Sequence, residues 1–382
     1  MKVGILVAVL VLSASTRLAG QSPVGDQRDV ENAAVKYLRA DASLRQSYPL
    51  APDAAAVLKG LVESPLNSED EKLVKAAGEA LDEFHHGASS KRCDWAISTD
   101  DGALANTAHR GAIMELVYVS ELRARLRFRD GNTTGAMSDL LTAMAAARHL
   151  STDGSLASVL FAYRLENALS GILAQDLYRF SPAQLRELAS DLDRLPSGSN
   201  LGIAFHQEKV LRNELLNIGR KANTRDDLIR LLLMRIPILQ SDQHSADAIV
   251  EGCGGTVKGF LDCVNQQHSF YNAWDSRFSL SPEQFESTYK IEIEKLSAKN
   301  PVIYQFTPNL ARFRWADAYC QTRRALMQVA IAIRLDGPDK LTWHPDPYDQ
   351  KPFTYVPIDN GFRLESRLLE NGVPLSLSII AR

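Results

Sequence analysis

The chain has 382 residues, of which 45% are hydrophobic and 23% are charged, so it can bury one large core or two moderate ones. The 43 Lys and Arg residues and 46 Asp and Glu residues give a formal net charge of −3. This balance offers no basic surface to nucleic acid, and the sequence therefore predicts no nucleic-acid binding.

The first twenty residues differ from the rest. Lys2 precedes an apolar run from Val3 to Leu12, and the small residues of Leu18-Ala19-Gly20 resemble a signal-peptidase cleavage site. We predict a secretory signal peptide over residues 1–20, with a short buried helix or strand as the alternative. Gln21 stands where a lipoprotein signal has its acylated Cys. We therefore expect export to the periplasm or the cell exterior, without a lipid anchor and without a transmembrane segment in the mature chain.

Residues 27–237 have apolar positions spaced by three and four, which predicts an antiparallel helical array. Early helices are expected over 27–41 and 53–63, and a third should begin at Asn67 or Ser68 and end near Gly87. Four further helical segments follow between residues 112 and 195. Short polar breaks separate them at residues 130–132, 151–154 and 180–182.

Two patterns within the array allow more than one interpretation. The segment from Arg123 to Met144 resembles one tetratricopeptide unit, but no second copy follows at a thirty-four-residue period, so a plain helical hairpin is preferred. Tyr163, Arg164 and Glu166 could line a groove, although core and surface packing explain them equally well. Glu121 precedes Arg125 by four residues, the spacing of a helical ion pair.

Two local sequences share one design for a helix start. Each has Ser as the N-cap, Pro in the first turn, Gln at the third position, and apolar residues on both sides. We predict helices beginning after Ser181 and after Ser281. The pattern leaves open whether the two starts reflect an internal repeat.

The remaining helices are expected over 201–221, 226–235 and 256–278, with a last long helix opened by Thr307-Pro308 and stopped by Gly337-Pro338. Residues 240–255 are polar and end in glycines, which favours a domain joint or a lid. The predicted organisation is an N-terminal array over 27–237, C-terminal helices over 256–336, and a tail over 337–382 packed on the last helix.

After Pro338 the apolar period changes to two. Strands are expected over 353–356, 362–368 and 375–380, joined by turns that contain Asn360-Gly361 and Asn371-Gly372. The sequence thus predicts a mainly α protein that ends in a small three-stranded antiparallel meander.

The tail carries a family resemblance. Residues 346–355 (DPYDQKPFTY) and 361–366 (GFRLES) resemble the C-terminal strands of type II secretion pseudopilins, and also the tails of a group of uncharacterised exported helical proteins of bacteria. The resemblance implies a shared β-tail and an exported location. It covers about a tenth of the chain, and Arg367-Leu368-Leu369 follows where pseudopilins continue toward an acidic calcium-binding loop. The pseudopilin anchoring helix is also missing, so pilus assembly is not implied.

Four cysteines are available for disulfides in an exported chain. Cys253 and Cys263 flank a short loop, and Cys93 with Cys320 would tie the early helices to the last one. Three pairings are formally possible, and free buried thiols are the alternative. The spacing does not suit a zinc site.

Motifs that carry chemistry are not found. The histidines stand outside HExxH and Cys/His patterns, and no nucleophile elbow, phosphate-binding loop or dinucleotide fingerprint occurs. Asp346, Asp349 and Asp359 were considered as calcium ligands, but a turn is the preferred reading. We therefore predict no catalytic residue, no cofactor and no metal.

These patterns favour a non-enzymatic exported protein that binds or scaffolds a protein or another partner in the cell envelope. The alternative is an envelope hydrolase or carbohydrate-acting enzyme whose carboxylates meet only in the fold. A shallow apolar groove would support the binding protein, whereas paired acids across a deep pocket would support the enzyme. A secretion-machine component is a third possibility and rests on the tail alone.

Overall fold

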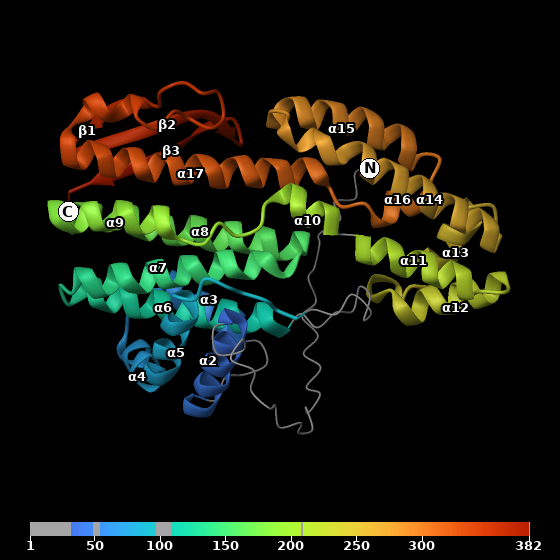
Figure 1. The fold of residues 1–382 in the computed structure, drawn as a ribbon, viewed down its shortest axis with the longest axis horizontal. Helices are drawn as coiled ribbons and strands as arrows, with labels where there is room; N and C mark the ends of the chain where they lie inside the picture. The colour runs from blue at the N-terminus through green and yellow to red at the C-terminus, as the bar shows by residue number, and fades with distance from the viewer. Residues whose placement is uncertain (1–31, 49–53, 97–107, 208, 382) are drawn as a thin grey trace.

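The computed structural model describes residues 32–48, 54–96, 108–207 and 209–381. The predicted signal peptide, residues 1–20, lies outside these ranges. The described chain is mainly helical and ends in a three-stranded antiparallel sheet, which confirms the predicted fold class (Figure 1). A tetratricopeptide-like arrangement is not confirmed.

Four helices form the N-terminal layer: α2 (Ala33–Ser47), α3 (Ala54–Glu63), α4 (Ser68–Ala76) and α5 (Gly78–Ala88). They pack on the two helices that follow them in the chain. The side chain of Asn67 accepts hydrogen bonds from the first turn of α4, and the Asp70 side chain accepts one from the backbone N–H of Asn67. This capping box confirms the predicted start. The single helix predicted to run on to Gly87 is instead interrupted at Ala77.

The central array consists of α6 (Ala108–Arg129), α7 (Thr133–Leu150), α8 (Leu156–Asp176) and α9 (Pro182–Arg194). Its helices lie where the polar breaks predicted them. The last long helix, α17 (Leu310–Asp336), returns along α8 and α9, so residues more than 100 positions apart in the sequence lie side by side (Figure 1). The interior is therefore built from helices at both ends of the chain.

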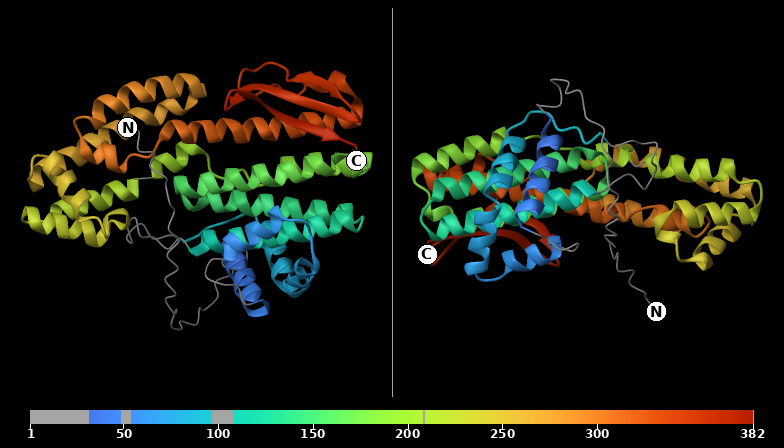
Figure 2. Two further views of the ribbon diagram at one scale, coloured as in Figure 1. Left: turned by 180° about the vertical axis from the view of Figure 1, so that it is seen from behind. Right: turned by 90° about the horizontal axis from the view of Figure 1, so that it is seen from below.

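The other end of the molecule is also helical, and it lies opposite the sheet along the long axis (Figure 2). Its elements are α10 (Leu201–Gln207), α11 (Lys209–Lys221), α12 (Arg225–Arg235), α13 (Gln243–Gly252), α14 (Val257–Trp274), α15 (Pro282–Ser297) and α16 (Pro301–Phe306). Most of the segment predicted as a joint or a lid, residues 240–255, is helix α13. Ala246, Ile249 and Val250 are spaced by three and four, and they bury one face of this helix.

The sheet consists of β1 (Thr354–Ile358), β2 (Gly361–Glu370) and β3 (Val373–Ile380), paired in sequence order. Asn360 and Asn371 both have positive φ, as the predicted tight turns require. One face of the sheet packs on α17 and α8. Since Leu364 and Leu377 belong to the same buried cluster as Leu326 of α17, the tail forms part of the main core.

The buried apolar side chains fall into three clusters. The largest joins α2–α9, much of α17 and the sheet. A second lies among α11–α14 and α16. The third, which contains the fully buried Trp274, connects α8 and α10 to α14–α17. The domain boundaries drawn from the sequence stay a prediction, but α17 takes part in both the first and the third cluster.

Ser181 provides a local test of how helix α9 begins. Its hydroxyl accepts a hydrogen bond from the backbone N–H of Gln184, whose side-chain oxygen accepts the backbone N–H of Ser181 at 2.9 Å. Ser181→Ala should lower the free energy of unfolding by about 1 kcal/mol, because one N–H of the first turn loses its acceptor. Urea unfolding measures this. Ser190→Ala, at an exposed site of the same helix, is the control and should change stability by less than about 0.5 kcal/mol.

Candidate functional site

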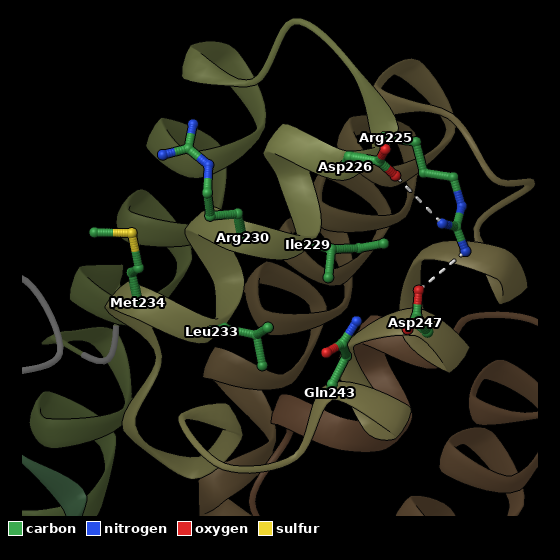
Figure 3. A pocket seen from close by; sticks show the side chains of 8 residues that line it. All are labelled: Arg225, Asp226, Ile229, Arg230, Leu233, Met234, Gln243 and Asp247. Atoms are coloured by element: carbon green, nitrogen blue, oxygen red, sulfur yellow. Dashed lines mark hydrogen bonds and ion pairs between the residues drawn. The ribbon is translucent and has the colours of Figure 1, made fainter.

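A surface hollow lies on α12 and α13. It encloses about 430 Å³ and is shown in Figure 3. We call it the α12–α13 groove. Its lining residues are Arg225, Asp226, Ile229, Arg230, Leu233, Met234, Gln243 and Asp247.

The apolar part of the groove comes from α12. Thr224 caps this helix by accepting the backbone N–H of Asp227, which fixes where its stripes begin. Ile229 and Leu233 are one turn apart and lie on the same face of the helix. Ile229 is buried, Leu233 is half-buried, and Met234 beside them is 61% exposed. The exposure of the apolar side chains in the groove thus increases from Ile229 to Met234.

The rim of the groove is charged but internally compensated. Arg225 contacts Glu251 at 2.7 Å and Asp247 at 3.1 Å, both on α13, and these contacts hold the two helices together. The hydrogen bond to Glu251 is the main reason that the pKa of Arg225 is raised. Arg230 pairs with Asp227 at 3.0 Å. The acids of the rim are therefore matched by arginines, and the groove has the apolar centre and polar border of a binding surface.

A smaller cavity of about 220 Å³ lies between the start of α15, α17 and the loop before the sheet. It is lined by Ser279, Ser281, Pro282, Arg314, Ala318, Gln321, Pro347 and Tyr348. Asp317 lies beside it and is 9% exposed. This carboxylate accepts hydrogen bonds from Tyr163 at 2.7 Å, Arg314 at 3.1 Å and Gln321 at 3.0 Å. Both carboxylate oxygens of Asp317 thus accept hydrogen bonds from other residues of the protein.

Glu166 lies deeper in the same interface. Its carboxylate accepts two hydrogen bonds each from Arg148 and Arg324, at 2.5–3.2 Å. Burial alone would favour the protonated form, but the hydrogen bonds from Arg324 and Arg148 outweigh it, and the pKa of Glu166 is lowered. An acid held ionised in this way does not donate a proton near neutral pH. Tyr163 and Glu166, which the sequence left open as groove residues, are both buried between α8 and α17.

All four cysteines are free thiols, so neither predicted disulfide is present in the structure. Cys93 follows α5 and lies against Thr152, whereas Cys320 is buried in α17 among Glu166 and Arg324. Their different surroundings explain why the predicted Cys93–Cys320 pair is not formed. Cys253 and Cys263 do lie in one buried cluster, and the thiol of Cys263 contributes to the raised pKa of Cys253.

Two of the three acids predicted as possible calcium ligands, Asp346 and Asp349, are engaged within the fold. Asp346 accepts the backbone N–H of Tyr348 at 2.9 Å and the hydroxyl of Ser366, while Asp349 pairs with Arg367 at 2.6 Å. Within the described ranges, no group of three or more His, Cys, Asp and Glu residues is placed to hold a metal ion.

Sequence reasoning missed the groove, although a signal was present. Residues 240–255 were interpreted as a joint because they are polar overall, and this hid the spacing of Ala246, Ile249 and Val250 that makes α13 a packed helix. Once α13 is recognised, Gln243 and Asp247 fall one helical turn apart on the flank of α13 that faces α12 (Figure 3).

Comparison with known proteins returned no relative. No protein-family model, curated protein or solved structure matches this chain. None of the described helices has both the length and the apolar character needed to cross a membrane. The α12–α13 groove must therefore be interpreted from its own residues.

Proposed function

We propose that this is an exported, non-catalytic binding protein that holds a segment of a cell-envelope protein in the α12–α13 groove. One observation carries the proposal: the α12–α13 groove has apolar side chains, those of Ile229, Leu233 and Met234, inside a rim of paired charges. A protein segment with one or two apolar anchors and polar flanks fits such a surface.

The charges of the groove support a protein partner over a highly charged ligand. Arg225 is already engaged by Asp247 and Glu251, and Arg230 by Asp227. An anion or a cation would have to compete with these internal pairs, while an apolar side chain would not. The affinity should therefore come from apolar burial around Met234, and the rim should contribute orientation.

The same features weigh against the alternative of a hydrolase acting through scattered carboxylates. Such an enzyme needs two acids facing a substrate, one of them protonated near neutral pH. In the described groove, Asp226 is largely exposed and lies 3.7 Å from Arg225. At the smaller cavity, Asp317 already accepts three hydrogen bonds. Neither hollow provides the required pair.

Met234→Asp should lower capture of the partner at least tenfold, because a carboxylate would then lie where an apolar anchor is buried. The measurement is quantitative pull-down from an envelope fraction with the full chain as bait, followed by identification of the captured proteins. Met234 is 61% exposed, so the substitution should leave the unfolding midpoint unchanged.

Ile291→Asp is the matched control, because Ile291 is 56% exposed on α15 and takes no part in the groove. A partner retained by this variant and lost by Met234→Asp would be specific to the groove. Equal capture by both variants would contradict the proposal. A captured protein that releases on addition of a sugar would point instead to carbohydrate binding.

A further inference from the structure

The turn between α13 and α14 brings two thiols together. Cys253 ends α13 and Cys263 lies in the second turn of α14. Both are buried, at 6% and 8% exposure, in the cluster formed by α11–α14 and α16. The two thiols are close enough that Cys263 contributes to the raised pKa of Cys253. Nine residues separate the two positions in the sequence, so the contact depends on how tightly the intervening segment folds back.

Glycines make this tight return possible. Gly254 and Gly255 have φ of +87° and +66°, a region that side-chain-bearing residues rarely adopt. In α14, a Cβ on Gly259 would lie 1.9 Å from the carbonyl oxygen of Cys253. Only glycine at this position lets the helix approach so closely. Because Gly259 and Cys263 are one helical turn apart, they lie on the same face of α14, toward Cys253.

We propose that Cys253 and Cys263 form a disulfide bond when the chain folds in an oxidising compartment. The oxidant is a small-molecule or protein disulfide. The thiolate of one cysteine attacks a sulfur of that disulfide, forms a mixed disulfide and releases one thiol. The other cysteine, after losing its proton, attacks the sulfur of the first cysteine and releases the second thiol. Two electrons and two protons thus pass from the cysteine pair to the oxidant.

Burial of the two thiols favours formation of the bond during folding, while both are still accessible to the oxidant. In the folded chain, burial and the neighbouring thiol of Cys263 raise the pKa of Cys253 far above its ordinary value, so the nucleophilic thiolate is rare. Once made, the bond closes a loop that the native turn already holds closed, and it limits the freedom of the unfolded chain. It also fixes α13, which supplies Gln243 and Asp247 to the groove. The inference is independent of what the groove binds.

The test is to refold the full chain in a buffer of reduced and oxidised glutathione, block the remaining thiols by alkylation, and map disulfide-linked peptides by mass spectrometry. We expect one intramolecular link, between Cys253 and Cys263, with Cys93 and Cys320 alkylated. The oxidised protein should melt about 5 °C above the same protein kept in a reducing buffer.

The double variant Cys253→Ser/Cys263→Ser is the control, and its melting temperature should be equal in the two buffers. Alkylation of all four cysteines after oxidative refolding would overturn the proposal. So would glutathione adducts at both positions, or a link between Cys93 and Cys320. Because the mapping uses the unmodified chain, the proposal remains testable even if the serine variants fold poorly.

Discussion

Glu166→Gln is expected to lower the free energy of unfolding by about 3–5 kcal/mol, one of the two largest effects of any single change considered for this chain. The Glu166 carboxylate is shared by Arg148 and Arg324. The side chains of Glu166, Arg148 and Arg324 are 3%, 12% and 33% exposed. Removing its charge leaves two guanidinium groups facing a neutral amide in a buried interface, and uncompensated buried charge is costly. Urea unfolding at pH 7 measures the effect.

A triple variant separates the charge from the packing. Replacing Arg148 and Arg324 by Met and Glu166 by Leu removes all three charges at similar volume, and it should recover most of the lost stability. The pH dependence gives a second check. Because the pKa of Glu166 is lowered in the fold, its contribution is complete above its ordinary value of 4.5 and is lost as the pH falls through the lower folded value. A cost below about 1 kcal/mol at pH 7 would contradict this account.

Much of the helical framework is predictable because caps and turns are local. Asn67, Ser181 and Thr224 each accept a backbone N–H within the next three residues, so their role is visible in a few letters of sequence. The positive φ of Asn360 and Asn371 likewise follows from the Asn-Gly turns. Helix α16, at six residues, was missed because it is too short to show a period.

The interior contacts were not predictable, because they join distant parts of the chain. Arg324 and Glu166 are 158 positions apart, and Tyr163 and Asp317 are 154 apart. No local pattern distinguishes these side chains from ordinary surface residues of amphipathic helices. The groove is different, because α12 and α13 follow one another in the chain, and the apolar spacing within α13 is a local signal for it. The sequence predicts the mainly helical fold class, whereas the contacts between distant polar residues depend on tertiary packing.

Glu121 differs from Glu166 in that its pKa is raised, not lowered, in the folded protein. Glu121 lies on α6 and is 7% exposed. Burial, with a smaller contribution from Glu63, raises its pKa to about 7 despite the attraction of Arg125. The guanidinium of Arg125 donates hydrogen bonds to the backbone carbonyls of Val62 at 2.6 Å and Ser64 at 2.8 Å. It thus connects α6 to the end of α3 as well as acting on Glu121.

Glu121→Gln should therefore stabilise the protein, by about 3 kcal/mol at pH 8. A carboxyl whose pKa is raised by folding holds its proton more tightly in the folded state, so wild-type stability falls as the pH rises from the ordinary value of 4.5 through about 7. Glutamine stays neutral throughout and avoids that loss. Urea unfolding of both proteins should give equal stabilities at pH 4 and a difference that grows between pH 5 and 8. A constant difference across this range would show that Glu121 is ionised in the fold at all these pH values, and that the burial of its charge is not what limits stability.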